Sequence, residues 1–254
     1  GAQPATGRRF GGGAAFNGSS SYVETPLTYN SIVNLNDKTQ NFSFSLWMYQ
    51  SSTPSGTKNV FVINEAAPTY QYIGLIVNGS NIRFTAYPGG AAGDTASTTT
   101  DLNTWTHIAC VRESSTMKIY KNGNLAQETP MLYSNLTLDS TLRWVFGSRR
   151  DGANDNYFDG KIDQVRIFNR ALDSGEVTTV YNDYFCQPGS TDVFSQCTSD
   201  TVGYPIVAAG GTGNGNTVAF YKLDDEEGSG TAADAIGAFT GQSAVFNGTN
   251  SAIS

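Results

Sequence analysis

The sequence predicts an all-β protein, an antiparallel β-sandwich of the jelly-roll type. At least eight short strand patterns follow one another along the chain, and turns rich in Gly and Asn separate them. Glycine occurs 28 times and charged residues form only 15% of the 254 residues, which is typical of a turn-rich extracellular β protein. One short segment alone carries a helical pattern.

Residues 42–49 (FSFSLWMY) show the clearest strand alternation. A period of two puts their apolar members on one face: Phe42, Phe44, Leu46 and Met48. Further strands are expected in NVFVIN, YIGLIVN, NIRFTAY, TWTHIACVRE, TMKIYKN, LRWVFGS and GKIDQVRIFNR. The pairs Asn78-Gly79 and Asn122-Gly123 predict tight hairpins between neighbouring strands.

The one expected helix lies in ALDSGEVTTVYND. Asp173 is placed as its N-cap, and Glu176 three residues later completes a capping box. Val177, Val180 and Tyr181 then share one face of the helix.

Three stretches, in this order, carry a family resemblance. FNGSSSYVE precedes FSFSLWMY, LNTWTHIACVRESSTMKIYKNG combines a Trp strand with an Asn-Gly hairpin, and FDGKIDQVRIFNRALDSGEVTTVYN joins a strand to the capped helix. Over residues 10–183 the chain resembles the laminin-G-like, concanavalin A-like lectin-glucanase jelly roll, in its pentraxin-related branch. The resemblance implies core positions for Trp47 and Trp105, and strand parity predicts the same for Trp144.

The chain also ends on a copy of its own beginning. At an offset of 230 residues, Ala14, Phe16, Asn17, Gly18 and Ser21 recur as Ala244, Phe246, Asn247, Gly248 and Ser251. Members of the resembled family open with a strand like VAFYKLD, which this chain carries at 218–224. We therefore expect a laminin-G-like jelly roll over 1–184, a Cys-flanked loop and Gly-rich linker over 185–217, and the first strands of a second repeat or a donor-strand segment over 218–254.

The C-terminal strands have two open interpretations. Either they fold back onto their own domain, as in a circular permutant, or they pair with a jelly roll in another copy of the protein. Head-to-tail pairing that does not close would produce a filament. The residues assigned to such assembly are Val218, Phe220, Tyr221, Leu223, Val245 and Phe246.

The net charge limits the kinds of partner that the protein can bind, and the cysteines indicate its cellular compartment. A net charge of −7 and a pI of about 4.6 argue against nucleic acid and against anionic membrane surfaces. No apolar run approaches the ~18 residues of a membrane span, so no membrane insertion is expected. Cys186 and Cys197 flank a short polar loop that a disulfide would close in an oxidising compartment, while Cys110 reads as a core residue. We expect an extracellular, cell-surface or virion-surface protein.

The sequence offers no catalytic site. Retaining glycosidases of related fold need two carboxylates about 5 Å apart. Asp163 has Lys161 and Arg166 near it instead of a second acid, and no Gly-x-Ser-x-Gly or His-Glu-x-x-His motif occurs. We therefore expect a protein that is not an enzyme.

The loop RRDGANDNYFDG is the stretch most typical of a metal site. Asp151, Asn154, Asp155 and Asp159 bring oxygen ligands close together, as calcium requires. A plain polar turn is the alternative, because Asp, Asn and Gly favour turns in any case.

Asp163 poses a burial problem within the last strand. By strict alternation it shares a face with Val165 and Ile167, which would bury its carboxylate. Pairing with Arg166 or with the loop at Asn17 would compensate the charge, and a β-bulge would instead reorient the side chain. Because the aspartate recurs in the resembled family, Asp163 and Asn17 are assigned structural roles.

Four tyrosines in or near loops are candidates for stacking on sugar rings: Tyr70, Tyr72, Tyr87 and Tyr157.

The first functional hypothesis is a non-catalytic extracellular or virion-surface structural and adhesive protein. It assembles through β-strand complementation between repeats or subunits, including into filaments. The alternative is a calcium-assisted, carbohydrate-binding lectin-like module. A glycoside hydrolase is the least supported class.

Overall fold

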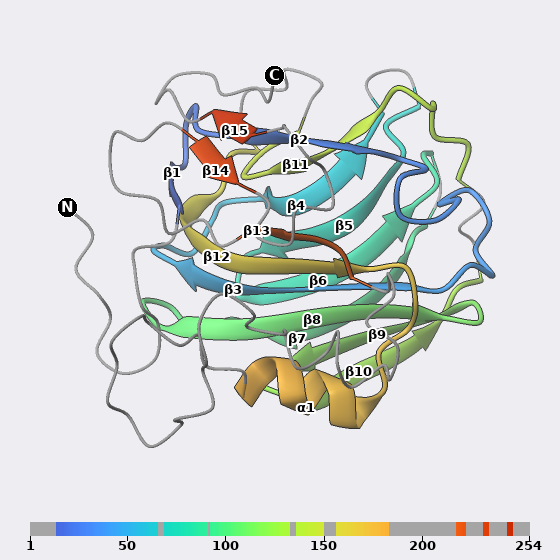
Figure 1. Ribbon diagram of the computed structural model, residues 1–254. Helices are drawn as coiled ribbons and strands as arrows, with labels where there is room; N and C mark the ends of the chain where they lie inside the picture. The colour runs from blue at the N-terminus through green and yellow to red at the C-terminus, as the bar shows by residue number, and fades with distance from the viewer. Residues whose placement is uncertain are drawn as a thin grey trace.

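The computed structural model describes residues 14–65, 69–90, 92–132, 136–149, 156–182, 217–221, 231–233 and 243–245. Over these residues the chain forms two antiparallel sheets that stack face to face (Figure 1). The expected all-β sandwich is therefore confirmed.

The two sheets, here called sheet A and sheet B, differ in strand order. Sheet A runs β1-β12-β3-β8-β9-β10, with β13 also paired to β12, and sheet B runs β2-β11-β4-β5-β6-β7. The strands of sheet A are β1 (Ala14–Asn17), β3 (Phe42–Gln50), β8 (Trp105–Glu113), β9 (Thr116–Lys121), β10 (Asn124–Pro130), β12 (Asp159–Phe168) and β13 (Thr217–Tyr221). The strands of sheet B are β2 (Val23–Thr28), β4 (Thr57–Asn64), β5 (Tyr72–Asn78), β6 (Asn81–Tyr87), β7 (Asp94–Thr99) and β11 (Arg143–Phe146). β14 (Thr231–Ala233) and β15 (Ser243–Val245) pair with each other.

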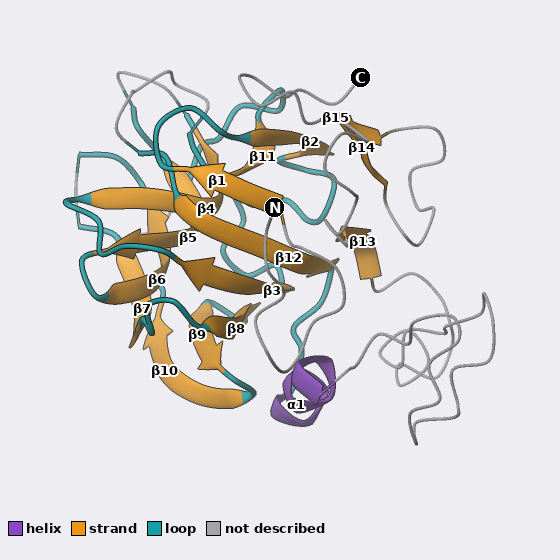
Figure 2. Ribbon diagram, turned by 90° about the vertical axis from the view of Figure 1, so that its left-hand side faces the viewer, coloured by secondary structure: helices purple, strands orange, loops and turns teal. Residues whose placement is uncertain are grey.

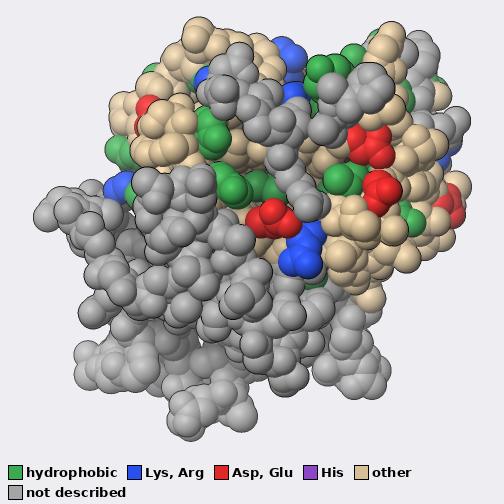
Figure 3. Space-filling model, turned by 90° about the horizontal axis from the view of Figure 1, so that it is seen from above, with side chains coloured by type: hydrophobic (Ala, Val, Ile, Leu, Met, Phe, Trp, Pro, Cys, Tyr) green, Lys and Arg blue, Asp and Glu red, His purple; other side chains and the backbone are tan. Residues whose placement is uncertain are grey.

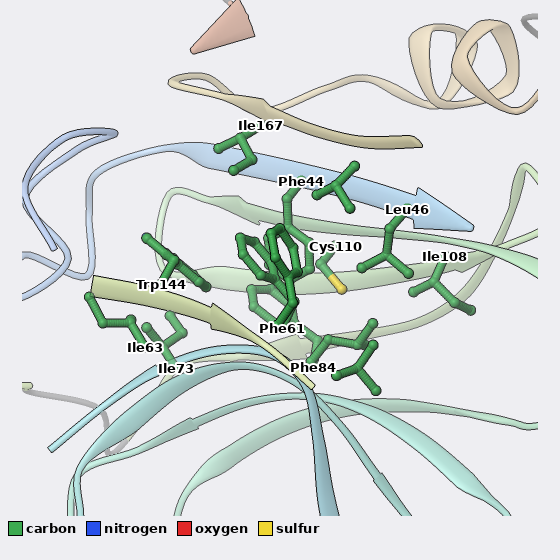
Figure 4. Packing of buried hydrophobic residues seen from close by; sticks show 14 of the residues in the cluster. Phe44, Leu46, Phe61, Ile63, Ile73, Phe84, Ile108, Cys110, Trp144 and Ile167 are labelled. Carbon is green, nitrogen blue, oxygen red and sulfur yellow. The ribbon is translucent and has the colours of Figure 1, made fainter. Parts of the chain in front are cut away.

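An aromatic cluster fills the space between the sheets (Figure 4). The ring centroid of Phe44 on β3 lies 5.2 Å from that of Phe61 on β4 and 5.6 Å from that of Phe84 on β6. All four apolar residues predicted for one face of β3 belong to this core, and so does Trp144. The core prediction is wrong for Trp105, which is half-buried on the outer side of β8, because the core there takes the even-numbered positions.

Two predicted hairpins are confirmed. β5 and β6 meet at Asn78-Gly79, where Gly79 has φ 57°, and β9 and β10 meet at Asn122-Gly123. Both residues of the second turn have positive φ, 49° and 82°. These left-handed backbone angles explain why Gly is favoured at position 79 and Asn-Gly at 122–123.

The predicted helix is also confirmed, as α1 (Ser174–Asn182), which lies below β8 in Figures 1 and 2. The capping box is complete, since the Glu176 amide donates to Asp173 Oδ1 at 2.8 Å and the Asp173 amide donates to Glu176 Oε2 at 3.0 Å. Val177 and Val180 are buried in a second apolar cluster on the outer side of sheet A. With nine residues α1 is too short to span a bilayer, and the described residues contain no other helix.

Two strands from opposite ends of the sequence share one edge of β12. β1 pairs with its first part, Ala14 opposite Ile162, and β13 pairs with its last part, Tyr221 opposite Val165. In this single chain β13 thus extends sheet A at β12. Seen from above, the described surface carries scattered acidic and basic side chains (Figure 3).

Candidate functional site

Three of the four candidate tyrosines lie near one end of the outer side of sheet B. Tyr72 on β5 and Tyr87 on β6 stand directly opposite each other, with ring centroids 5.4 Å apart and planes inclined by 32°. Tyr70 precedes β5, and the guanidinium carbon of Arg149 lies 5.8 Å from its ring centroid. We call Tyr70, Tyr72, Tyr87, Arg83 and Arg149 the tyrosine face.

Strand alternation fixes which side chains reach this face. The core-facing residues of β5 and β6 are Ile73, Leu75 and Val77, and Ile82, Phe84 and Ala86. The intervening positions therefore point outward, which places Tyr72, Arg83 and Tyr87 on the outer side.

Tyr70 is held in an unusual conformation. Its φ is 52°, which is rare for a bulky side chain, and its side chain is 46% exposed. Hydrogen bonds fix the residues around it: the Thr69 hydroxyl donates to Glu65 Oε2 at 2.6 Å, and Gln71 exchanges two bonds of 2.7 Å with Thr137. A strained, exposed aromatic ring on a pinned backbone is typical of a binding site.

The electrostatics of the face centre on the Tyr72 hydroxyl. Burial raises the pKa of Tyr72, and the neighbouring Tyr87 adds to this effect. Arg149 and Arg83 act in the opposite direction, since a nearby positive charge favours the phenolate. Both guanidinium groups therefore lie close enough to influence the same hydroxyl.

A concavity, here called the rim pocket, opens at the end of the sandwich. It has a volume of about 340 Å³, and its walls include Asn17, Gln50, Ser52, Lys58, Tyr157 and Asp159. Tyr157 forms a β-bridge with Asn59, whereas Tyr72 pairs with Asn64 five positions further along β4. That separation is roughly 17 Å, so Tyr157 is not part of the tyrosine face.

Asn17 and Asp159 form local hydrogen bonds beside this pocket. Asn17 Oδ1 accepts from the amides of Ser19, Ser20 and Ser21 at 2.8–3.0 Å, which closes the turn after β1. Asp159 Oδ2 accepts from the Ser52 hydroxyl at 2.6 Å.

The candidate calcium ligands are only partly placed. Asp159 lies in the rim pocket, while Asp151, Asn154 and Asp155 lie outside the described residues. In the described part of the chain, no three acidic, His or Cys side chains form a group suited to a metal ion. The loop is described at its two ends: Arg149 is beside Tyr70, and the Asn156 carbonyl accepts from the Asn59 amide at 2.9 Å.

Asp163 does not share a face with Val165 and Ile167, so that expectation is wrong. The register of β12 against β3 shifts after Asp163, and Gln164 takes φ 50°. This bulge inserts one extra residue and keeps Val165 and Ile167 in the core. Asp163 instead lies on the outer side, opposite Trp47 and only 1% exposed, as the bulge alternative required.

Next to Asp163, three aromatic rings attach the helix to sheet A. The ring centroid of His107 lies 5.3 Å from that of Trp47 and 5.7 Å from that of Tyr181 on α1. Trp47 is therefore buried, but on the outer side of sheet A and not in the main core.

The remaining predicted residues divide between described and undescribed segments. Val218, Phe220 and Tyr221 belong to β13, and Val245 belongs to β15. Leu223, Phe246, Cys186 and Cys197 lie outside the described residues. Cys110 is a buried free cysteine, and burial raises the pKa of its thiol.

Comparison with known proteins identifies the family. Residues 17–178 match the model of the concanavalin A-like lectin/glucanases superfamily, which is more than half of the chain. The chain belongs to this superfamily. A search of curated proteins gave no match.

Solved structures of the superfamily fold include sugar-binding domains. The CBM40 domain of the Ruminococcus gnavus IT-sialidase, bound to α2,3-sialyllactose, superposes with a TM-score of 0.53 at 12% identity, over 67% of this chain and 96% of that one. Domain 4 of AbnA, a Geobacillus stearothermophilus arabinanase, in complex with arabinotriose, gives 0.50 at 21% identity, over 66% and 76%. The Trypanosoma rangeli sialidase gives a TM-score of 0.53 at 18% identity, but the match spans 68% of this chain and only 28% of the enzyme. At these low sequence identities, the superpositions show that the chains share a fold.

Sequence reasoning missed the two arginines of the tyrosine face. Arg83 has the same strand parity as Tyr87 in NIRFTAY, so the alternation already placed both on one side. No strand alternation predicts the position of Arg149, because this residue follows β11 and its position depends on the path of the chain after that strand.

Proposed function

We propose that the protein is a non-catalytic carbohydrate-binding module that works outside the cell or on a cell or virion surface, with its sugar site at the tyrosine face. The convergence of Tyr70, Tyr72 and Tyr87 beside two arginines is the observation that supports this most strongly. Aromatic rings contact the apolar C–H side of a sugar, while phenol and guanidinium groups bind its hydroxyls.

Two further observations support the sugar class and the absence of catalysis. The titles of the CBM40 and AbnA domain structures, which share the fold, name bound oligosaccharides. The groups that form the tyrosine face are phenols and guanidiniums, while a retaining glycosidase acts through a pair of carboxylates.

Calcium assists binding in this proposal, through Asp151, Asn154, Asp155 and Asp159. Its support is the position of the loop ends, one at the tyrosine face and the other at the rim pocket. An ion there would stabilise the loop beside Arg149, so chelation is expected to weaken sugar binding.

A glycan array, probed with calcium and with EDTA, tests the proposal. We expect binding to a defined set of glycans, weakened by EDTA and lost in Tyr87→Ala. Tyr49→Ala is the matched control, because Tyr49 is half-buried on the outer side of sheet A, 5.8 Å from Trp105. Binding to no glycan, or equal losses in both variants, would contradict the proposal.

Assembly through β strands is a second candidate function, supported by the pairing of β13 with the edge of β12. The same pairing made between copies would join them through backbone hydrogen bonds, and unclosed head-to-tail pairing would give filaments. The test compares the mass in solution of the full chain with that of a chain ending at residue 216. The same number of copies per particle for both chains would exclude strand-mediated assembly.

A further inference from the structure

The tyrosine face carries two positive charges in a chain whose net charge is −7. Arg83 lies on the outer side of β6, four residues before Tyr87, so the two Cα atoms are roughly 13 Å apart. The guanidinium carbon of Arg149 lies 5.8 Å from the ring centroid of Tyr70. A ligand that lies on Tyr87 and extends along β6 would therefore meet the guanidinium group of Arg83.

Arg83 differs from the other described arginine of sheet B. Arg143 on β11 has a protein counter-ion, since its Nε lies 3.6 Å from Glu24 Oε1. Arg83 is half-buried and forms neither an ion pair nor a side-chain hydrogen bond within the described part of the chain. Its charge is thus available to a ligand.

The carboxylate nearest in sequence to Tyr70 is already engaged. Glu65 accepts hydrogen bonds from the Thr69 hydroxyl at 2.6 Å and from the Asp139 amide at 3.0 Å. These bonds hold Glu65 to the Thr69 side chain and to the backbone at Asp139, and within the described segments Glu65 forms no ion pair with Arg83.

We propose that the tyrosine face selects sugars that carry a carboxylate, an inference that rests on the proposed function. A guanidinium group binds a carboxylate through two parallel hydrogen bonds, a geometry that a neutral hydroxyl does not offer. The tyrosine rings supply the contact common to all sugars, and Arg83 adds selectivity for the acidic ones. Charge-assisted bonds of this kind correspond to a preference of roughly tenfold or more.

The test titrates the full chain with a panel of neutral oligosaccharides, each paired with a counterpart in which one sugar is replaced by its uronic acid. We expect the acidic member to bind roughly tenfold more tightly. Arg83→Gln should remove that preference, because it lowers the affinity for the acidic member more than the affinity for the neutral member. Arg143→Gln is the matched control and should leave both affinities unchanged.

The possible failures of the two proposals are distinct. Equal affinities for both members of each pair, or a preference that survives Arg83→Gln, would overturn the selectivity for carboxylates and leave sugar binding intact. A panel in which no member binds would overturn both proposals. Circular dichroism of Arg83→Gln verifies that the variant is folded.

Discussion

Gly147 provides the most demanding test of how β1 is attached to the sandwich. Its φ is 78°, and a Cβ added there would lie 2.1 Å from Cδ1 of Phe16, whose ring is only 4% exposed. Gly147→Ala would cost roughly 1–2 kcal/mol for the left-handed backbone. Expelling the Phe16 ring from the core would add roughly 1.5–3 kcal/mol. We therefore expect a total of roughly 2.5–5 kcal/mol, or a fall in Tm of roughly 10 °C for a domain of this size.

Gly79→Ala is the control for this experiment. Gly79 also has a positive φ, 57°, but its added Cβ meets nothing within 4 Å. It should cost the backbone strain alone, roughly 1–2 kcal/mol. Chemical denaturation measures both free energies, and hydrogen exchange should show lost protection of β1 only in Gly147→Ala. Equal costs for the two variants would refute the argument that Phe16 is displaced.

Three further predictions concern the helix and the bulge. Asp173→Ala removes the N-cap and should lower the free energy of unfolding by about 1 kcal/mol, measured by urea denaturation. The hydrogen bond from Arg170 holds the pKa of Glu176 below its usual 4.5, so this pair stabilises the fold above that pH, and the contribution is lost as the pH falls through the lowered value. Arg170→Gln should therefore make the stability less dependent on pH below about 5, and an unchanged acid profile would contradict this. Asp163→Ala removes a buried carboxyl group and should lower Tm by several degrees, whereas an unchanged Tm would disprove a structural role.

Much of the fold was predictable because strand alternation and helix capping depend on residues that are close together in the sequence. The alternation of β3 and the capping box of α1 both appear in the structure as the pattern requires. The alternation rule failed at Asp163, because one extra residue at Gln164 reverses the parity and no periodic rule detects it.

The candidate site was only partly predictable. A two-residue loop at Asn78-Gly79 would pair Tyr72 with Thr85, whereas the structure places the loop at Gly79-Ser80 and pairs Tyr72 with Tyr87. The hairpin was therefore predictable from the sequence, but its register was not. The separation of Tyr157 from these rings depends on the loop after β11, where long-range hydrogen bonds decide the path.

Hydrogen exchange in the presence of a bound oligosaccharide tests the location of the sugar site most directly. The account predicts new protection at residues 70–74 and 83–87, which carry the tyrosine face. Residues 156–159 at the rim pocket should exchange as in the free protein. Protection confined to 156–159 would contradict the assignment of the sugar site to the tyrosine face.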